Sequence, residues 1–198
     1  MFILGYTQIF NAEVIAIFFV FIFCKISCST FIKTNDNKLM EKIRVAFCNS
    51  MIMATILNLG LYYEYIKYEK ECSFTFYRLG IFLLHSFLVE FIYYYWHMAM
   101  HRVPILRKIH IKHHQITPPM AFIDAFYLDW LDFTSFVIIL LSPFFVGLQL
   151  TQTEHLSFLT IEALLLMMEH TEKWFETHKK HHMPSKMNGF FALTGLFD

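Results

Sequence analysis

The sequence WHMAMH at residues 96–101 opens the part of the chain that determines its architecture, and HIKHH at residues 110–114 follows after a short interval. A third stretch, HKKHH at residues 178–182, repeats the HxxHH spacing of the second. We call these stretches the first, second and third boxes. Residues three and four apart lie on one face of an α-helix, so each box is expected to present its imidazoles on one side of a helix. This spacing is typical of metal ligands.

The chain has eleven histidines, and most of them belong to the boxes: His97, His101, His110, His113, His114, His178, His181 and His182. A ninth, His170, lies upstream of the third box, and only His85 and His155 lie elsewhere. One pair of histidines four residues apart is usually a surface accident, whereas three ordered boxes indicate a metal site. Imidazole suits zinc, copper, iron and nickel. Because one zinc ion takes about four ligands, a set of this size predicts two metal ions.

The ordered boxes resemble those of the fatty acid hydroxylase and sterol desaturase superfamily. The resemblance rests on Tyr94-Tyr95-Trp96-His97 with His101, on the second box, and on the third box followed by Asn188-Gly189, and it covers roughly residues 91–198. It implies an integral membrane enzyme with a di-iron centre, built as one domain over residues 1–198. Residues 1–80 would supply N-terminal membrane helices, and residues 81–198 the catalytic region. The implied iron ligands are the eight box histidines together with His170.

Members of this superfamily use dioxygen to hydroxylate or desaturate a lipid. The resemblance therefore implies an iron-dependent oxidoreductase of lipid biosynthesis in the endoplasmic reticulum, with a fatty acyl, sterol or sphingolipid substrate. Residues 178–198 also resemble the end of the histidine region in the plant wax-synthesis members, which are associated with turning aldehydes into alkanes. One alternative is thus an aldehyde decarbonylase-like enzyme, and another is a non-enzymatic membrane protein that binds or transports metal. An intramembrane zinc protease is disfavoured because the chain has no HExxH motif.

Composition independently indicates an integral membrane protein, and the apolar runs described below indicate that it is all-α. Apolar residues make up 57% of the 198 residues, with 24 phenylalanines, and the mean hydropathy is positive. Lysine plus arginine equals aspartate plus glutamate, which argues against a nucleic-acid partner. The four cysteines form no CxxC pair and are interpreted as packing residues.

Apolar runs predict four or five transmembrane helices: residues 9–24, 46–65, 74–97, 133–150 and 156–168. No basic residue precedes the first run, so we expect it to remain as a helix and not to be a cleaved signal peptide. Residues 30–44 are expected to form a loop, and residues 151–155 a polar tip. The fifth run is shorter than the ~20 residues of a full span. It is therefore either extended by His155 and Glu169 or forms a hairpin that enters the bilayer and returns.

Lysine and arginine predict the orientation of these spans. They are enriched in residues 25–44, in residues 102–112 and after residue 168, and sparse in residues 67–78. Positive residues favour the cytosolic side, so the boxes are expected to form a cytosolic helical cap on a multi-pass protein with its N-terminus outside. Pro104, Pro118-Pro119 and Pro184 bound the boxes. We expect Pro104 to end one helix and open the next, and the later prolines to stop the helices that carry the second and third boxes.

Several polar residues are candidates for supporting the ligands: Glu90, Asp124, Asp129, Asp132 and Asn188. The three aspartates could accept the second N–H of ligand imidazoles, or they could be solvated interface residues. Glu90 lies more than one helical turn from His97, so it would support ligands, line a substrate channel or form a helix–helix hydrogen bond. His170 precedes His181 by about 16.5 Å on a continuous helix. If His170 is a ligand, the chain must bend between Thr171 and Thr177.

No haem-binding His-Pro-Gly-Gly segment and no glycine motif for a flavin or nicotinamide is present, so electrons are expected from another protein. The resemblance implies a b-type cytochrome, or a ferredoxin with its reductase. Basic residues near the boxes would form its docking surface: Arg107, Lys108, Lys179 and Lys180.

Overall fold

The computed structural model describes residues 38–63, 65–70, 75–170 and 176–183. Within these ranges the protein is all-α, as the sequence predicts, and the only bridge between extended segments is an isolated one joining Glu69 and Thr151. The first apolar run, Pro184 and Asn188 lie outside the described residues.

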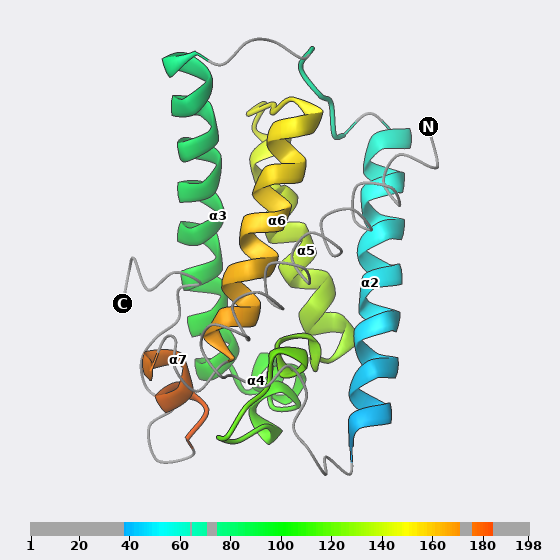
Figure 1. Cartoon of the computed structure of the whole chain (residues 1–198), viewed down its shortest axis with the longest axis vertical. Helices are drawn as coiled ribbons and strands as arrows, with labels where there is room; N and C mark the ends of the chain where they lie inside the picture. Colours follow the sequence, from blue (N-terminus) through cyan, green and yellow to red (C-terminus); the bar gives the residue numbers. More distant parts are fainter. Residues whose placement is uncertain (1–37, 64, 71–74, 171–175, 184–198) are drawn as a thin grey trace, which may run out of the picture.

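The two longest helices flank a central pair of helices (Figure 1). Helices α2 (Leu39–Tyr62) and α3 (Phe76–Arg102) are both long and apolar enough to cross a membrane. Only 28% of the most apolar window of α2, and 17% of that of α3, is buried inside the protein. A core helix of a soluble protein would bury most of such a window, so these exposed apolar faces favour contact with lipid.

The start of α2 differs from the sequence prediction. Residues 39–44 were expected in a loop, and that prediction is wrong because α2 already begins at Leu39. Tertiary contacts hold this polar segment: Lys42 forms a buried ion pair with Asp124, and the Tyr127 hydroxyl donates to Glu41. Charged residues that read as a loop in the sequence therefore anchor the helix to the segment after the second box.

Helices α5 (Trp130–Phe145) and α6 (Gln152–Glu169) form the central pair, with Pro143 in the last turn of α5. Residues 151–155 do not form the predicted polar tip. Thr151 caps α6 by accepting from Glu154 N, while the Glu154 carboxylate accepts from Thr151 N, so the segment becomes the first turn of the helix. The fifth run is thus extended at both ends, by His155 and by Glu169, and His155 is fully buried.

Short helices follow the long ones at the lower end of the bundle in Figure 1. Pro104 opens α4 (Pro104–His110) directly after α3, as predicted. The second box does not continue to Pro118 as one helix, because α4 ends at His110 and a 3₁₀ turn, η1 (His113–Gln115), replaces it. A second 3₁₀ segment, η2 (Phe122–Phe126), precedes α5. The tighter 3₁₀ spiral changes the direction of the second box within a few residues.

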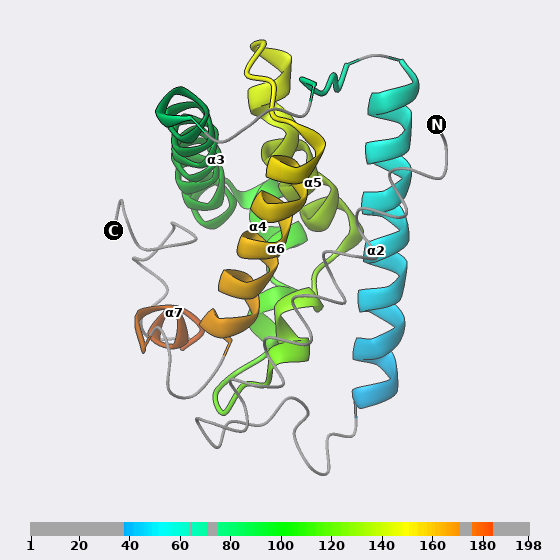
Figure 2. The same cartoon turned by 45° about the horizontal axis from the view of Figure 1, so that its top comes forward.

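The third box begins on α7 (Glu176–His181), and its last residue, His182, directly follows that helix. His170 caps the end of α6, so it and the third box belong to separate elements, as the ligand interpretation of His170 requires, and the expected bend itself lies outside the described residues. Both views place α7 beside the end of α6 (Figure 1, Figure 2). The fold therefore gathers the ends of α3, α4, α6 and α7 at one end of the bundle.

Candidate metal centre

The nine histidines singled out in the sequence fall into two groups, each of which could hold a metal ion. The first group consists of His97, His101, His110, His114 and His181, and the second of His113, His170, His178 and His182. Within each group every residue offers one ring nitrogen, and these nitrogens lie within 4.8 Å of one another. Eight of the nine side chains are buried, and His101 is half-buried.

Each HxxHH box divides its histidines between the two groups. The first and last histidines of the second box, His110 and His114, belong to the first group, whereas His113 belongs to the second. The third box does the reverse, because His178 and His182 belong to the second group and His181 to the first. The second and third boxes thus each supply a pair four residues apart to one group and a single residue to the other.

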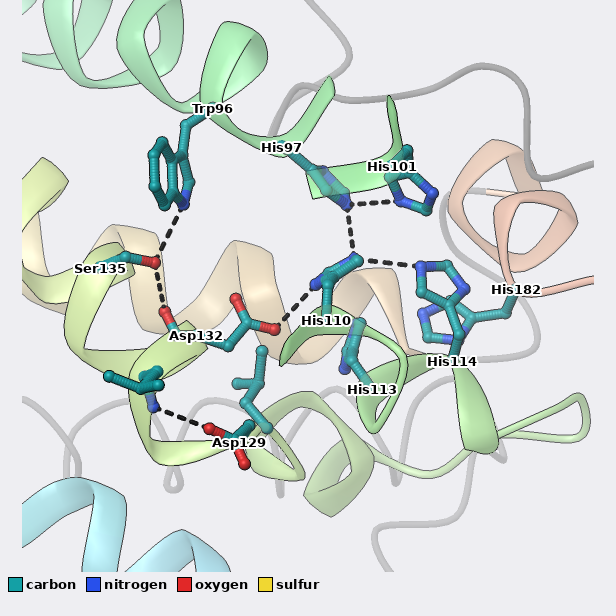
Figure 3. Close-up of polar contacts among 12 residues, drawn as sticks. Trp96, His97, His101, His110, His113, His114, Asp129, Asp132, Ser135 and His182 are labelled. Carbon is teal, nitrogen blue, oxygen red and sulfur yellow. Dashed lines mark hydrogen bonds and ion pairs between the residues drawn. The ribbon is translucent and has the colours of Figure 1, made fainter. Parts of the chain in front are cut away.

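In the first group the Nε2 atoms converge on His110 (Figure 3). The Nε2 of His110 lies 3.0 Å from that of His97 and 3.0 Å from that of His114. The Nε2 atoms of His101 and His97 are 3.3 Å apart, and the His181 ring packs edge-on against that of His101 at 4.5 Å between centroids.

In the second group the Nε2 atoms converge on His178. The Nε2 of His178 lies 3.1 Å from that of His182 and 3.3 Å from that of His170. The Nε2 atoms of His170 and His113 are 3.4 Å apart. Rings of the two groups also pack together. His114 stacks on His182 with 4.7 Å between ring centroids, and the centroids of His110 and His113 are 5.5 Å apart. The two groups therefore adjoin.

Hydrogen bonds at Nδ1 fix the tautomers of several of these rings. The Nδ1 of His170 lies 2.8 Å from the carbonyl oxygen of Leu166, and that of His182 lies 3.0 Å from the carbonyl oxygen of Ile116. A carbonyl oxygen only accepts, so each Nδ1 carries the hydrogen and each Nε2 carries a lone pair. Both lone pairs lie within 3.3 Å of His178 Nε2 and are available to a metal ion.

The spacing of the Nε2 atoms fits such a cation. Metal–nitrogen bonds of about 2.1 Å place neighbouring ligand nitrogens about 3.0 Å apart in an octahedron and about 3.4 Å apart in a tetrahedron. The Nε2 contacts in the two groups span 3.0 to 3.4 Å. The residues present therefore fit a bound metal ion in each group.

Burial keeps these imidazoles neutral and ready to bind metal. Desolvation, followed by the effect of neighbouring imidazoles, lowers the pKa of His113, His178 and His182 well below 6.5. Desolvation also lowers the pKa of His170 to about 4, although the Leu166 carbonyl and Asp124 partly oppose it. Metal ligands must be unprotonated, so the site is in its binding form at neutral pH.

Asp132 is the predicted acid that reaches a box histidine, with its carboxylate 2.7 Å from His110 Nδ1 (Figure 3). The indole of Trp96 donates to the Ser135 hydroxyl at 2.9 Å, which in turn donates to the Asp132 carbonyl oxygen at 2.7 Å. These bonds fasten α3 to α5 beside the site. The sequence analysis did not single out Glu169, whose carboxylate lies 3.6 Å from His178 Nδ1. Its position next to His170 in the sequence could have identified Glu169 as a residue near the metal centre.

The other predicted acids have different positions. Asp124 pairs with Lys42 and accepts from Ala121 N at 2.8 Å, so it holds η2 in place. Asp129 caps α5 by accepting from Leu131 N at 3.0 Å. Glu90 is buried in α3 and interacts electrostatically with Glu162, a buried residue of α6 that the sequence analysis also missed.

Comparisons of the chain with models of known protein families, with curated proteins and with solved structures found no match. The interpretation of the two groups therefore rests on their own geometry: nine imidazoles in two adjoining groups, with ring nitrogens that lie close together.

Proposed function

We propose that the two histidine groups hold a di-iron centre, and that the protein is a membrane-bound oxidoreductase that uses dioxygen to hydroxylate or desaturate a lipid. The observation that carries the proposal is the convergence of nine imidazole nitrogens, nearly all of them on buried side chains, in two adjoining groups. A set of neutral imidazoles suits iron, because it holds the ion without adding negative charge.

The division of the second and third boxes between the groups favours a single binuclear centre over two independent sites. Because His113 lies between His110 and His114 in sequence, moving the second box shifts ligands of both groups. The third box links the groups in the same way through His181. Such shared supports would keep two ions at a fixed separation, as two-metal chemistry requires.

When bound, the iron centre would supply the reduction of dioxygen to an oxidant that removes hydrogen from an unactivated C–H bond. The chain's own residues hold and orient that centre and keep water away. Asp132 and Glu169 lie at Nδ1 of His110 and His178 and orient those rings. The surrounding burial leaves His101 as the most accessible of the nine ligands.

A position in the membrane would give the centre access to lipid. The exposed side chains of α3 include Leu83, Phe87, Phe91 and Tyr95, which form an apolar surface leading toward the first box. In the proposed arrangement the protein is multi-pass in the endoplasmic reticulum, with the boxes on the cytosolic side. Electrons arrive from a b-type cytochrome, or from a ferredoxin and its reductase.

The test is lipid analysis of a heterologous membrane that contains the full chain, supplied with ¹⁸O-labelled dioxygen. We expect a new hydroxylated or desaturated lipid, with label in any hydroxyl group, that is absent with the His178→Ala variant. An iron-loaded protein that produces neither lipid would contradict the oxidoreductase proposal and favour metal storage or transport.

A further inference from the structure

A pocket opens beside the first histidine group, with a cavity volume of about 340 Å³. Its lining consists of His101, Arg102, Pro104, Arg107, Lys108 and Ile111. Four of these residues, at positions 104, 107, 108 and 111, follow the spacing of one helical face along α4 and its C-terminal cap. The pocket is therefore a feature built by the junction of α3 and α4.

Among the described residues, the lining is cationic and carries no carboxylate. Arg102, Arg107 and Lys108 are exposed, and none of the three forms an ion pair within the described ranges. Three like charges facing one small cavity repel one another, and an anion relieves that repulsion. Guanidinium groups bind phosphate oxygens in pairs, and lysine adds a further charged donor.

Apolar side chains surround the cations. Val103, Ile105 and Ile111 are exposed, and Ile105 is 71% accessible. A short helix that exposes both aliphatic and basic residues suits the boundary between lipid headgroups and acyl chains. This combination favours a phosphate carried by a lipid over a free phosphate.

The pocket also reaches the metal centre. His101 lines it and is the one half-buried member of the nine histidines, the others being buried. A headgroup held by Arg107 and Lys108 would therefore lie at the accessible side of the first group.

We propose that this pocket binds the phosphate group of an anionic lipid and holds that lipid at the opening of the metal centre. The inference rests on the proposed function only in identifying the bound lipid as substrate. The binding site itself rests on the pocket, its charge and its apolar surroundings. A small concave site fits a phosphate group better than it fits the broad surface of an electron-donor protein.

The experiment measures binding of short-chain phosphatidic acid to the purified full-length protein in detergent, beside short-chain phosphatidylcholine and inorganic pyrophosphate. The test variant is Arg107→Glu/Lys108→Glu, and the matched control is Lys67→Glu/Lys70→Glu, which makes the same charge change at exposed sites outside the pocket. We expect the test variant to bind phosphatidic acid about tenfold more weakly, equivalent to about 1.4 kcal/mol. The control should bind as the unaltered protein does.

Two further readouts separate the explanations. Metal content should be unchanged in the test variant, so a loss of binding cannot be attributed to a lost centre or to unfolding, and binding should weaken as salt rises.

Unchanged phosphatidic acid binding by the test variant would overturn the proposal. So would binding of pyrophosphate without phosphatidic acid, which would identify a soluble phosphate ligand. If the variant lost only its reduction by an acidic donor protein, the surface would be a docking site instead. Failure of lipid oxidation with phosphatidic acid binding intact would contradict the proposed function alone.

Discussion

Both ends of the helix bundle contain buried histidines, but the two sets have different surroundings. At the metal end, nine imidazoles turn their nitrogens toward one another. Toward the other end, the rings of His85 and His155 pack against phenylalanines, with His85 4.7 Å from Phe158 and His155 5.1 Å from Phe144 between ring centroids. The Tyr68 hydroxyl lies 2.8 Å from His155 Nδ1. Burial of histidine is common to both ends, whereas convergence of acceptor nitrogens distinguishes the metal centre.

The largest effect is expected when a histidine of the metal end is replaced, and a replacement at the other end provides the comparison. His110→Ala or His178→Ala should abolish turnover and release the iron ion of its own group, because supporting groups cannot replace a missing ligand nitrogen. His85→Leu, which exchanges one buried ring for an aliphatic side chain, should retain the iron. Metal analysis of the purified variants makes the comparison. Equal loss of iron from His85→Leu would show that burial alone, and not convergence, governs metal content.

Acid should also empty the metal end. An unfolded histidine takes a proton as the pH falls through 6.5, whereas buried His170 resists protonation until about pH 4. The unfolded state therefore binds more protons in this window, so the contribution to stability is complete above pH 6.5 and is lost between 6.5 and 4. In the folded state, protons compete with metal only as the pH approaches the lowered pKa of about 4. Thermal unfolding and metal analysis against pH should therefore show stability falling first, below pH 6.5, and metal content falling near pH 4. Full metal retention well below pH 4 would require ligands other than imidazole.

The acids beside the ligands should have a smaller effect. Asp132→Asn and Glu169→Gln remove the charge at Nδ1 of His110 and His178 and should weaken metal binding by roughly 10- to 100-fold. Asp132 should matter more, because its contact is 2.7 Å and that of Glu169 is 3.6 Å. Competition with a chelator measures the change. Unaltered affinity in both variants would limit these acids to packing.

The smallest effect should come from Asp129, three residues from Asp132. Asp129→Ala removes the cap of α5 and should lower the free energy of unfolding by about 1 kcal/mol, without loss of metal. Chemical denaturation and metal analysis of the same sample separate the two quantities. A drop in metal content as large as that of Asp132→Asn would place Asp129 in the site.

The sequence predicted eight of the candidate ligands because the spacing within the boxes is a local property of helices, and it predicted His170 through the family resemblance. It did not predict how they divide, since HxxHH on an ideal helix places His110, His113 and His114 on one face. The third box divides in the same way although His178 and His181 both lie on α7, so the division depends on tertiary packing and not on spacing. Nor could spacing distinguish Asp132 from Asp124 and Asp129. Which acid reaches a histidine depends on how α5 packs beside α4.

The start of α2 and the first turn of α6 were missed for a related reason. Lys42 and Glu154 are charged residues, which in the sequence indicate loops. In the folded protein Lys42 pairs with Asp124, and Glu154 pairs with Arg78 while completing the cap of α6. These partners lie more than 70 positions away in the sequence, so no local pattern could reveal them.

The measurement that tests the central claim most directly is the number of iron ions per chain in the purified protein and in His170→Ala. His170 belongs to the second group alone. The structure therefore predicts that about two ions per chain fall to about one, with the first group still occupied. An unchanged count in His170→Ala would remove this residue from the centre, and a protein that binds no metal in any form would contradict the claim itself.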